Sequence, residues 1–67
     1  MDLVEVTVLI NHPEVMKDEA ILNMYLRKRK ELVEAINQDL AKMGLGPFTT
    51  KELLRMSPNP ALADTID

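Results

Sequence analysis

The chain has 67 residues, a formal net charge of −3 and no cysteine. A chain of this length forms one domain at most, and so small a core usually needs disulfides, a metal or oligomerisation to reinforce it. The lack of cysteine excludes disulfides, and His12 as the only imidazole leaves too few ligands for a structural zinc site. Oligomerisation remains, so we expect a protein that works in contact with other protein.

The first apolar segment alternates between two faces. Its even positions are apolar and its odd positions are mixed, which predicts a half-buried strand over residues 3–10, with a helix as the alternative. The apolar strand face consists of Val4, Val6, Val8 and Ile10. No later segment offers a second strand, and each buried peptide group left unpaired would cost about 1–3 kcal/mol. We therefore expect this strand to pair with another chain.

A long amphipathic helix is predicted from about residue 13 to residue 43. Asn11 and Pro13 suit its start, Asp18 offers a second start, and Gly44 suits the left-handed position past its end. Along it, mostly apolar residues recur at alternating steps of four and three, which is a heptad seam typical of a coiled coil. The seam contains Leu22, Leu26, Arg29, Val33, Ile36, Leu40 and Met43.

A second, short helix is predicted over about residues 50–56. Thr49 and Glu52 have the spacing of a capping box, with Phe48 and Leu53 as its hydrophobic staple. Two prolines within residues 57–60 exclude continuation, so residues 57–67 are expected to be a flexible, extended tail. The predicted fold class is a mainly helical α+β domain over residues 1–56, with one strand and two helices.

The strand face and the heptad seam together form the predicted dimer and partner interface. It consists of Val4, Val6, Val8, Ile10, Leu22, Leu26, Arg29, Val33, Ile36 and Leu40. Arg29 occupies a seam position that would normally hold leucine, and two interpretations stay open. It selects the register of association, or it marks the point where the helix leaves the core.

A basic cluster lies in the middle of the long helix. Arg27, Lys28 and Lys30 are candidates for contact with a partner protein or with nucleic acid, since adjacent cations raise the local potential. Successive residues of a helix point in different directions around its axis, however, so these cations do not form one patch. Glu31 and Glu34 lie four residues after Arg27 and Lys30, a spacing at which opposite charges can pair on a helix. The pattern favours a solvated helix surface, and we expect no nucleic-acid partner.

The predicted order of a strand followed by two helices resembles the ribbon-helix-helix repressors. The resemblance covers residues 4–16, where Val6-Thr7-Val8 precede Pro13 and Glu14. It implies an alternative function, a dimeric transcriptional regulator that binds DNA through basic residues. The chain departs from that pattern because the exposed strand face carries Glu5 and neither lysine nor arginine.

No catalytic constellation is present. His12 has no second group placed for acid–base work and is expected to cap a turn. We expect no enzyme activity, no cofactor and no small-molecule substrate. Met16, Met24, Met43 and Met56 either fill gaps in the core or line an adaptable surface for an apolar partner.

The sequence thus favours a small, non-catalytic protein–protein interaction module that acts as a homodimer. Adaptor, assembly and inhibitory proteins, including viral ones encoded by bacteriophages, are of this kind. Its partners would be a second copy of the chain and another protein. The absence of cysteine favours a reducing, cytoplasmic compartment, and the longest uncharged run, residues 6–13, is too short for the roughly 20 apolar residues that span a bilayer.

Overall fold

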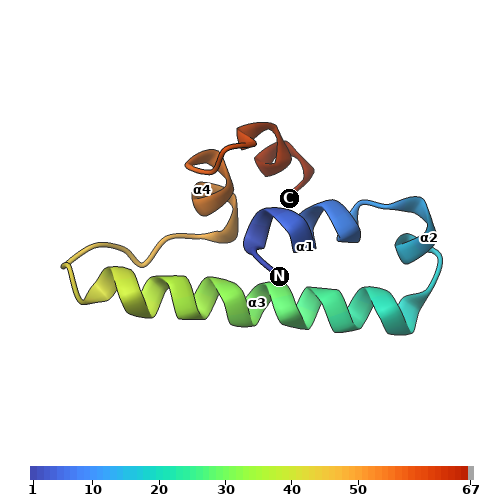
Figure 1. The fold of residues 1–67 in the computed structure, drawn as a ribbon, viewed down its shortest axis with the longest axis horizontal. Coiled ribbons are helices and arrows are strands. Elements are labelled where there is room, and N and C mark those ends of the chain that lie inside the picture. Colours follow the sequence, from blue (N-terminus) through green and yellow to red (C-terminus); the bar gives the residue numbers. More distant parts are fainter. Residues whose placement is uncertain (67) are drawn as a thin grey trace.

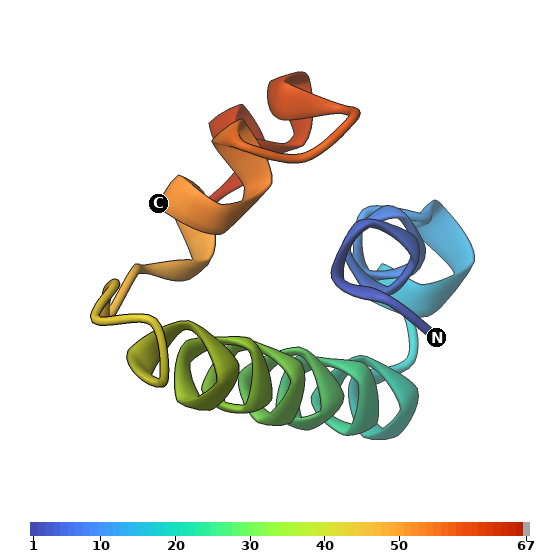
Figure 2. The ribbon, with the colours of Figure 1, turned by 60° about the vertical axis from the view of Figure 1, so that its left-hand side comes forward.

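A computed structural model describes residues 1–66, which are built from helices. The elements are α1 (Leu3–Ile10), α2 (Pro13–Met16), α3 (Glu19–Ala41), α4 (Thr50–Arg55) and a 3-10 helix, η1 (Pro60–Thr65). α3 forms the floor of the fold, with α1 along one side and α4 with η1 along the other (Figures 1 and 2). At about 34 Å, α3 runs most of the 39 Å length of the molecule.

The strand predicted over residues 3–10 is wrong, and with it the α+β class, because these residues form α1 and no strand occurs within residues 1–66. Asp2 caps this helix, since its Oδ1 accepts a hydrogen bond from the Glu5 N–H at 2.8 Å. The Thr7 hydroxyl donates to the carbonyl of Leu3 at 2.7 Å, so a β-branched residue adds a bond inside the helix. The peptide groups of residues 3–10, which seemed to need hydrogen-bond partners in another chain, largely find those partners within α1.

The residues of α1 match a helical period as well as an alternating one. Its buried side chains are Leu3, Val6, Thr7 and Ile10, which follow the i, i+3, i+4, i+7 spacing of one helix face. Poor intrinsic propensity costs β-branched residues up to about 0.7 kcal/mol each in a helix. Burying a valine or isoleucine side chain contributes about 1.5–3 kcal/mol, so packing outweighs propensity here.

The single helix predicted over residues 13–43 is divided into α2 and α3. Lys17 ends α2, and Asp18 begins α3 as its cap, with Oδ1 accepting from the Ile21 N–H at 3.2 Å. Asp18 was the second start that the sequence offered. The cap of α2 is His12, whose Nδ1 accepts from the Glu14 N–H at 3.1 Å, so His12 is a capping residue as expected. Asn11 instead ends α1.

The end of α3 and the whole of α4 follow the sequence signals closely. Gly44 adopts a φ of 75°, and the Leu45 N–H donates back to the carbonyl of Leu40 at 3.0 Å. The capping box before α4 is complete, with both Thr49–Glu52 hydrogen bonds present. These bonds to Thr49 lower the pKa of the Glu52 carboxyl.

One asparagine joins α3 to the segment before α4. The Asn37 amide donates to the carbonyl of Phe48 and accepts from its N–H, both at 2.8 Å. This pair of bonds satisfies both backbone groups of Phe48, which would otherwise lie partly buried without partners. The position of α4 relative to α3 is therefore defined by a single side chain as well as by the chain connection.

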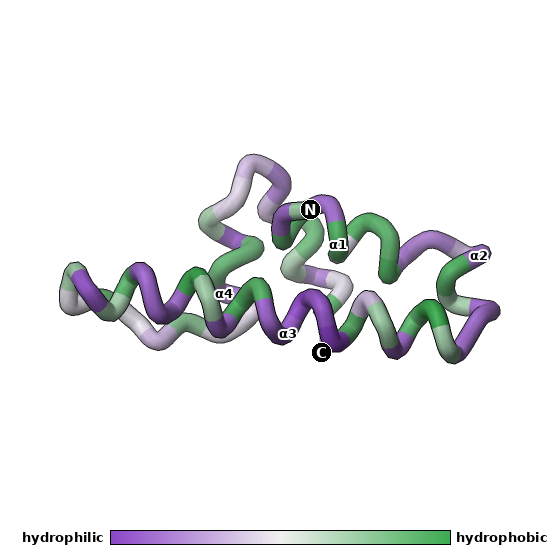
Figure 3. The backbone as a smooth tube through the Cα atoms, turned by 60° about the horizontal axis from the view of Figure 1, so that its bottom comes forward, coloured by the Kyte–Doolittle hydropathy of each residue, from purple (hydrophilic) through white to green (hydrophobic). Residues whose placement is uncertain are grey.

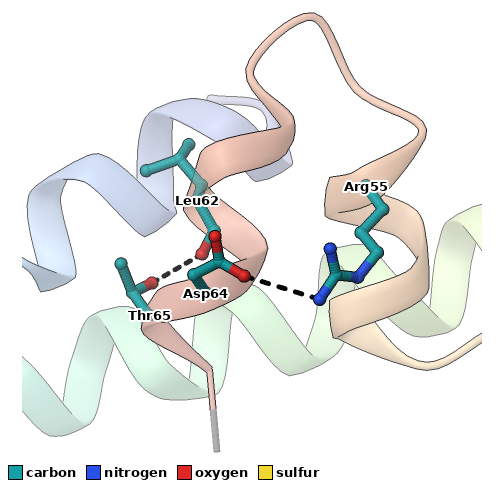
Figure 4. A network of polar contacts seen from close by, with 4 residues as sticks. All are labelled: Arg55, Leu62, Asp64 and Thr65. Carbon is teal, nitrogen blue, oxygen red and sulfur yellow. Dashed lines mark hydrogen bonds and ion pairs between the residues drawn. The ribbon is translucent and has the colours of Figure 1, made fainter.

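The extended tail predicted over residues 57–67 is also wrong for the residues that the structure describes. Residues 60–65 form η1, which packs against α4 and places Ala63 in the core. Figure 4 shows the polar contacts of this segment, where Arg55 Nη2 lies 3.4 Å from Asp64 Oδ1 and the Thr65 hydroxyl donates to the carbonyl of Leu62. Asp67 lies outside the described residues.

The core is a single small cluster to which α3 contributes no fully buried residue. Its buried hydrophobic members are Leu3, Val6, Ile10, Leu53, Leu54 and Ala63. They come from α1, α4 and η1, while α3 supplies half-buried side chains beneath them. The longest helix therefore supports the core without entering it.

Leu54→Ala tests this location of the core. Leu54 is fully buried, so truncation should lower the free energy of unfolding by about 2–5 kcal/mol, a large share of the total for so small a domain. Met56 lies two residues later and is exposed, so Met56→Ala should change the free energy of unfolding by less than about 0.5 kcal/mol. Urea unfolding followed by circular dichroism measures both, and equal losses would contradict the core described here.

Candidate interaction surface

An open apolar groove of about 440 Å³ lies where α1, α3 and α4 meet. Its lining consists of Asp2, Leu3, Val4, Ile36, Leu53, Ser57 and Pro58. Two of its walls come from the start of α1 and from α4 with the segment after it, which lie on opposite sides of Figure 2. Most of the lining is apolar, so the groove suits an apolar side chain.

The predicted strand face does not exist as a surface. Because residues 3–10 are helical, its four members point in different directions: Val6 and Ile10 are buried, Val4 lines the groove, and Val8 is 48% exposed. The helical spacing of Leu3, Val6 and Ile10 was the signal that could have identified the correct face. The sequence interpretation missed Leu3, Leu53 and Pro58 as groove residues.

The structure places the six predicted interface residues of the heptad seam on one side of α3. Leu22, Leu26, Arg29, Val33, Ile36 and Leu40 are all half-buried, and the apolar ones pack against the core cluster of their own chain. Figure 3 shows the alternation of hydrophobic and hydrophilic residues along α3 beside the mostly hydrophobic α1. We call this set the inner seam, because α1 and α4 lie over it.

Arg29 is the one charged member of the inner seam. Partial burial lowers the pKa of its guanidinium, since removal from water disfavours the charged form. Within residues 1–66 no ion pair or side-chain hydrogen bond involves Arg29. Partial burial of an unpaired charge disfavours folding, so we expect Arg29 to lower the stability of the chain.

The basic cluster does not form a single patch. Arg27, Lys28 and Lys30 are exposed and spread around the outer side of α3, as four successive helical residues must be. The pairing with Glu31 and Glu34 that their spacing allows does not form. The ion pairs among residues 1–66 are Lys17–Glu14, Lys42–Asp39 and Arg55–Asp64.

No group of three or more histidine, cysteine, aspartate or glutamate residues within residues 1–66 is placed to hold a metal ion. None of the helices in the described part of the chain has the length and apolar character needed to cross a membrane.

Comparison with known proteins assigns the chain to no family. The chain matches no family model, no curated protein and no solved structure. The structure also argues against the ribbon-helix-helix interpretation, because the residues that would form its DNA-reading strand form α1.

Arg29→Leu tests the energetic role of the inner seam. Replacing a half-buried, unpaired cation by an apolar side chain among apolar neighbours should raise the free energy of unfolding by about 1 kcal/mol. Lys30→Leu, one residue later and exposed, should leave it within about 0.5 kcal/mol. Thermal and urea unfolding measure the difference, and a loss of stability in Arg29→Leu would mean that the guanidinium makes a stabilising contact.

Proposed function

We propose that this chain is a non-catalytic protein–protein interaction module that self-associates as a homodimer and also binds another protein. The observation that carries the proposal is the distribution of its large hydrophobic side chains. All five methionines are exposed, and so are Val8, Ile21 and Leu45. None of these methionines fills the core, which favours the second of the two roles that the sequence left open.

The amount of exposed surface supports the same proposal. The chain exposes 4712 Å², whereas a compact monomer of 7.6 kDa exposes about 4,300 Å². The difference of about 400 Å² reflects an elongated fold in which one long helix is covered on one side only. Methionine is well suited to a surface that binds protein, because its flexible, polarisable side chain adapts to different apolar partners.

The groove at the start of α1 is the feature best suited to a second protein. It is open, its walls come from three different helices, and its lining is dominated by Leu3, Val4, Ile36, Leu53 and Pro58. An apolar side chain on a partner would be removed from water there, at roughly 25 cal/mol for each Å² buried. This role rests on shape and apolar character alone.

Sedimentation equilibrium tests self-association. As concentration rises, the mass should increase from 7.6 kDa towards twice that value, because association removes some of the exposed apolar side chains from water. Met43→Gln alters the most exposed methionine, two residues past the end of α3, and should leave this increase in mass unchanged, because one exposed side chain does not determine the association. A single species with the mass of one chain at every concentration would contradict the homodimer.

A further inference from the structure

A second heptad pattern runs along the outward side of α3, away from the inner seam. Its residues recur at alternating steps of three and four, like those of the inner seam, and all of them are exposed. They are Ile21, Met24, Lys28, Glu31, Ala35 and Gln38. We call this set the outer seam, and nothing within residues 1–66 covers it.

The charges at the centre of the outer seam have opposite signs and no partners in their own chain. Lys28 and Glu31 are consecutive members of the seam, and Arg27 and Glu34 flank it on one side. None of these four side chains takes part in an ion pair within residues 1–66. Their charges are available to a partner.

An antiparallel copy of α3 complements the charges of this pattern. If Lys28 of one copy faces Glu31 of the other, symmetry places Glu31 of the first against Lys28 of the second. Equal steps outward from this centre then bring Met24 opposite Ala35 and Ile21 opposite Gln38. The apolar members of the seam thus lie on either side of two reciprocal ion pairs.

The residues beside the outer seam agree with the same register. Antiparallel helices bring matching flanks together, so Arg27 faces Glu34 of the other copy, and Ala20 faces Ala41. The ion pairs number four by symmetry, two Lys28–Glu31 and two Arg27–Glu34. Alanine at both ends of the flank lets the two backbones approach closely.

A parallel arrangement in register is disfavoured by the same residues. It would place Lys28 against Lys28 and Glu31 against Glu31, and like charges that face each other at adjacent positions repel. For a second copy of this chain, the charge pattern therefore favours the antiparallel direction over the parallel one.

We infer that two copies of the chain associate through the outer seam of α3, with the two helices antiparallel and centred between Lys28 and Glu31. This inference rests on the proposed function, for which it names the surface of self-association. It leaves the groove, which lies on the opposite side of α3, unobstructed. A homodimer of this form would carry two grooves that face away from the shared contact.

Charge reversal in two complementary variants tests the inference. Arg27→Glu/Lys28→Glu makes all four central residues acidic, and Glu31→Lys/Glu34→Lys makes all four basic. Each variant alone should dimerise with a dissociation constant raised about tenfold or more, because every attractive pair becomes repulsive. An equimolar mixture should recover the dimer, since each acidic residue then faces a basic one. Sedimentation equilibrium at low ionic strength, where exposed ion pairs are screened least, measures all three samples.

Lys17→Glu/Lys51→Glu is the matched control, since it changes the net charge as much as the acidic variant but lies outside α3. It should dimerise as the unaltered chain does. Circular dichroism of each variant should remain helical, because the altered side chains are exposed except that of Lys51, which is half-buried. Dimerisation of either reversed variant at the original affinity, or failure of the mixture to recover, would overturn the outer seam while leaving a homodimer through another face. A monomeric unaltered chain would overturn both.

A disulfide test determines the direction independently of charge. The chain has no cysteine, so Met24→Cys and Ala35→Cys each introduce one thiol. In the antiparallel dimer these two positions face each other, and mild oxidation of the mixed variants should give chiefly a disulfide-linked heterodimer. Faster linkage of the Met24→Cys chain to itself would overturn the antiparallel arrangement.

Discussion

The fold depends on the contact of α1 with the hydrophobic cluster that it shares with α4 and η1. Val6, Leu54 and Ala63 are completely buried in this cluster, and these three side chains come from distant parts of the chain. α3 has no such residue, so it is held in place by the half-buried inner seam beneath the cluster. Because the short segments bury their apolar faces over one side of α3, its other side is left to solvent.

The sequence predicted the helix boundaries best where a side chain completes a local hydrogen bond. Gly44, Asp18 and the Thr49–Glu52 capping box each act within a few residues, and the structure contains all of them. The class of residues 3–10 was decided by contacts with residues far along the chain. Their apolar positions fit a period of two and a period of 3.6 equally well, so the pattern alone could not distinguish strand from helix.

For the interaction surface too, local patterns could be predicted from the sequence, whereas contacts between distant residues could not. The inner seam was visible as a heptad, but its coverage by α1 depends on α1 being a helix. The groove joins Val4 to Leu53 and Pro58, and no local pattern connects residues so far apart in the sequence. The charges near Lys28 and Glu31 were visible too, although their spacing suggested pairing within one helix, and the structure leaves them unpaired within residues 1–66.

Because the methionines are exposed, their oxidation would alter the surface of the protein without disturbing the packing of the core. Peroxide converts a methionine thioether into a polar sulfoxide, which disrupts packing wherever that side chain is buried. In this protein every methionine is at least half-exposed, and the core cluster contains none. Oxidative damage would therefore fall on exposed side chains, of which Met24 belongs to the outer seam, while the folded domain stayed intact.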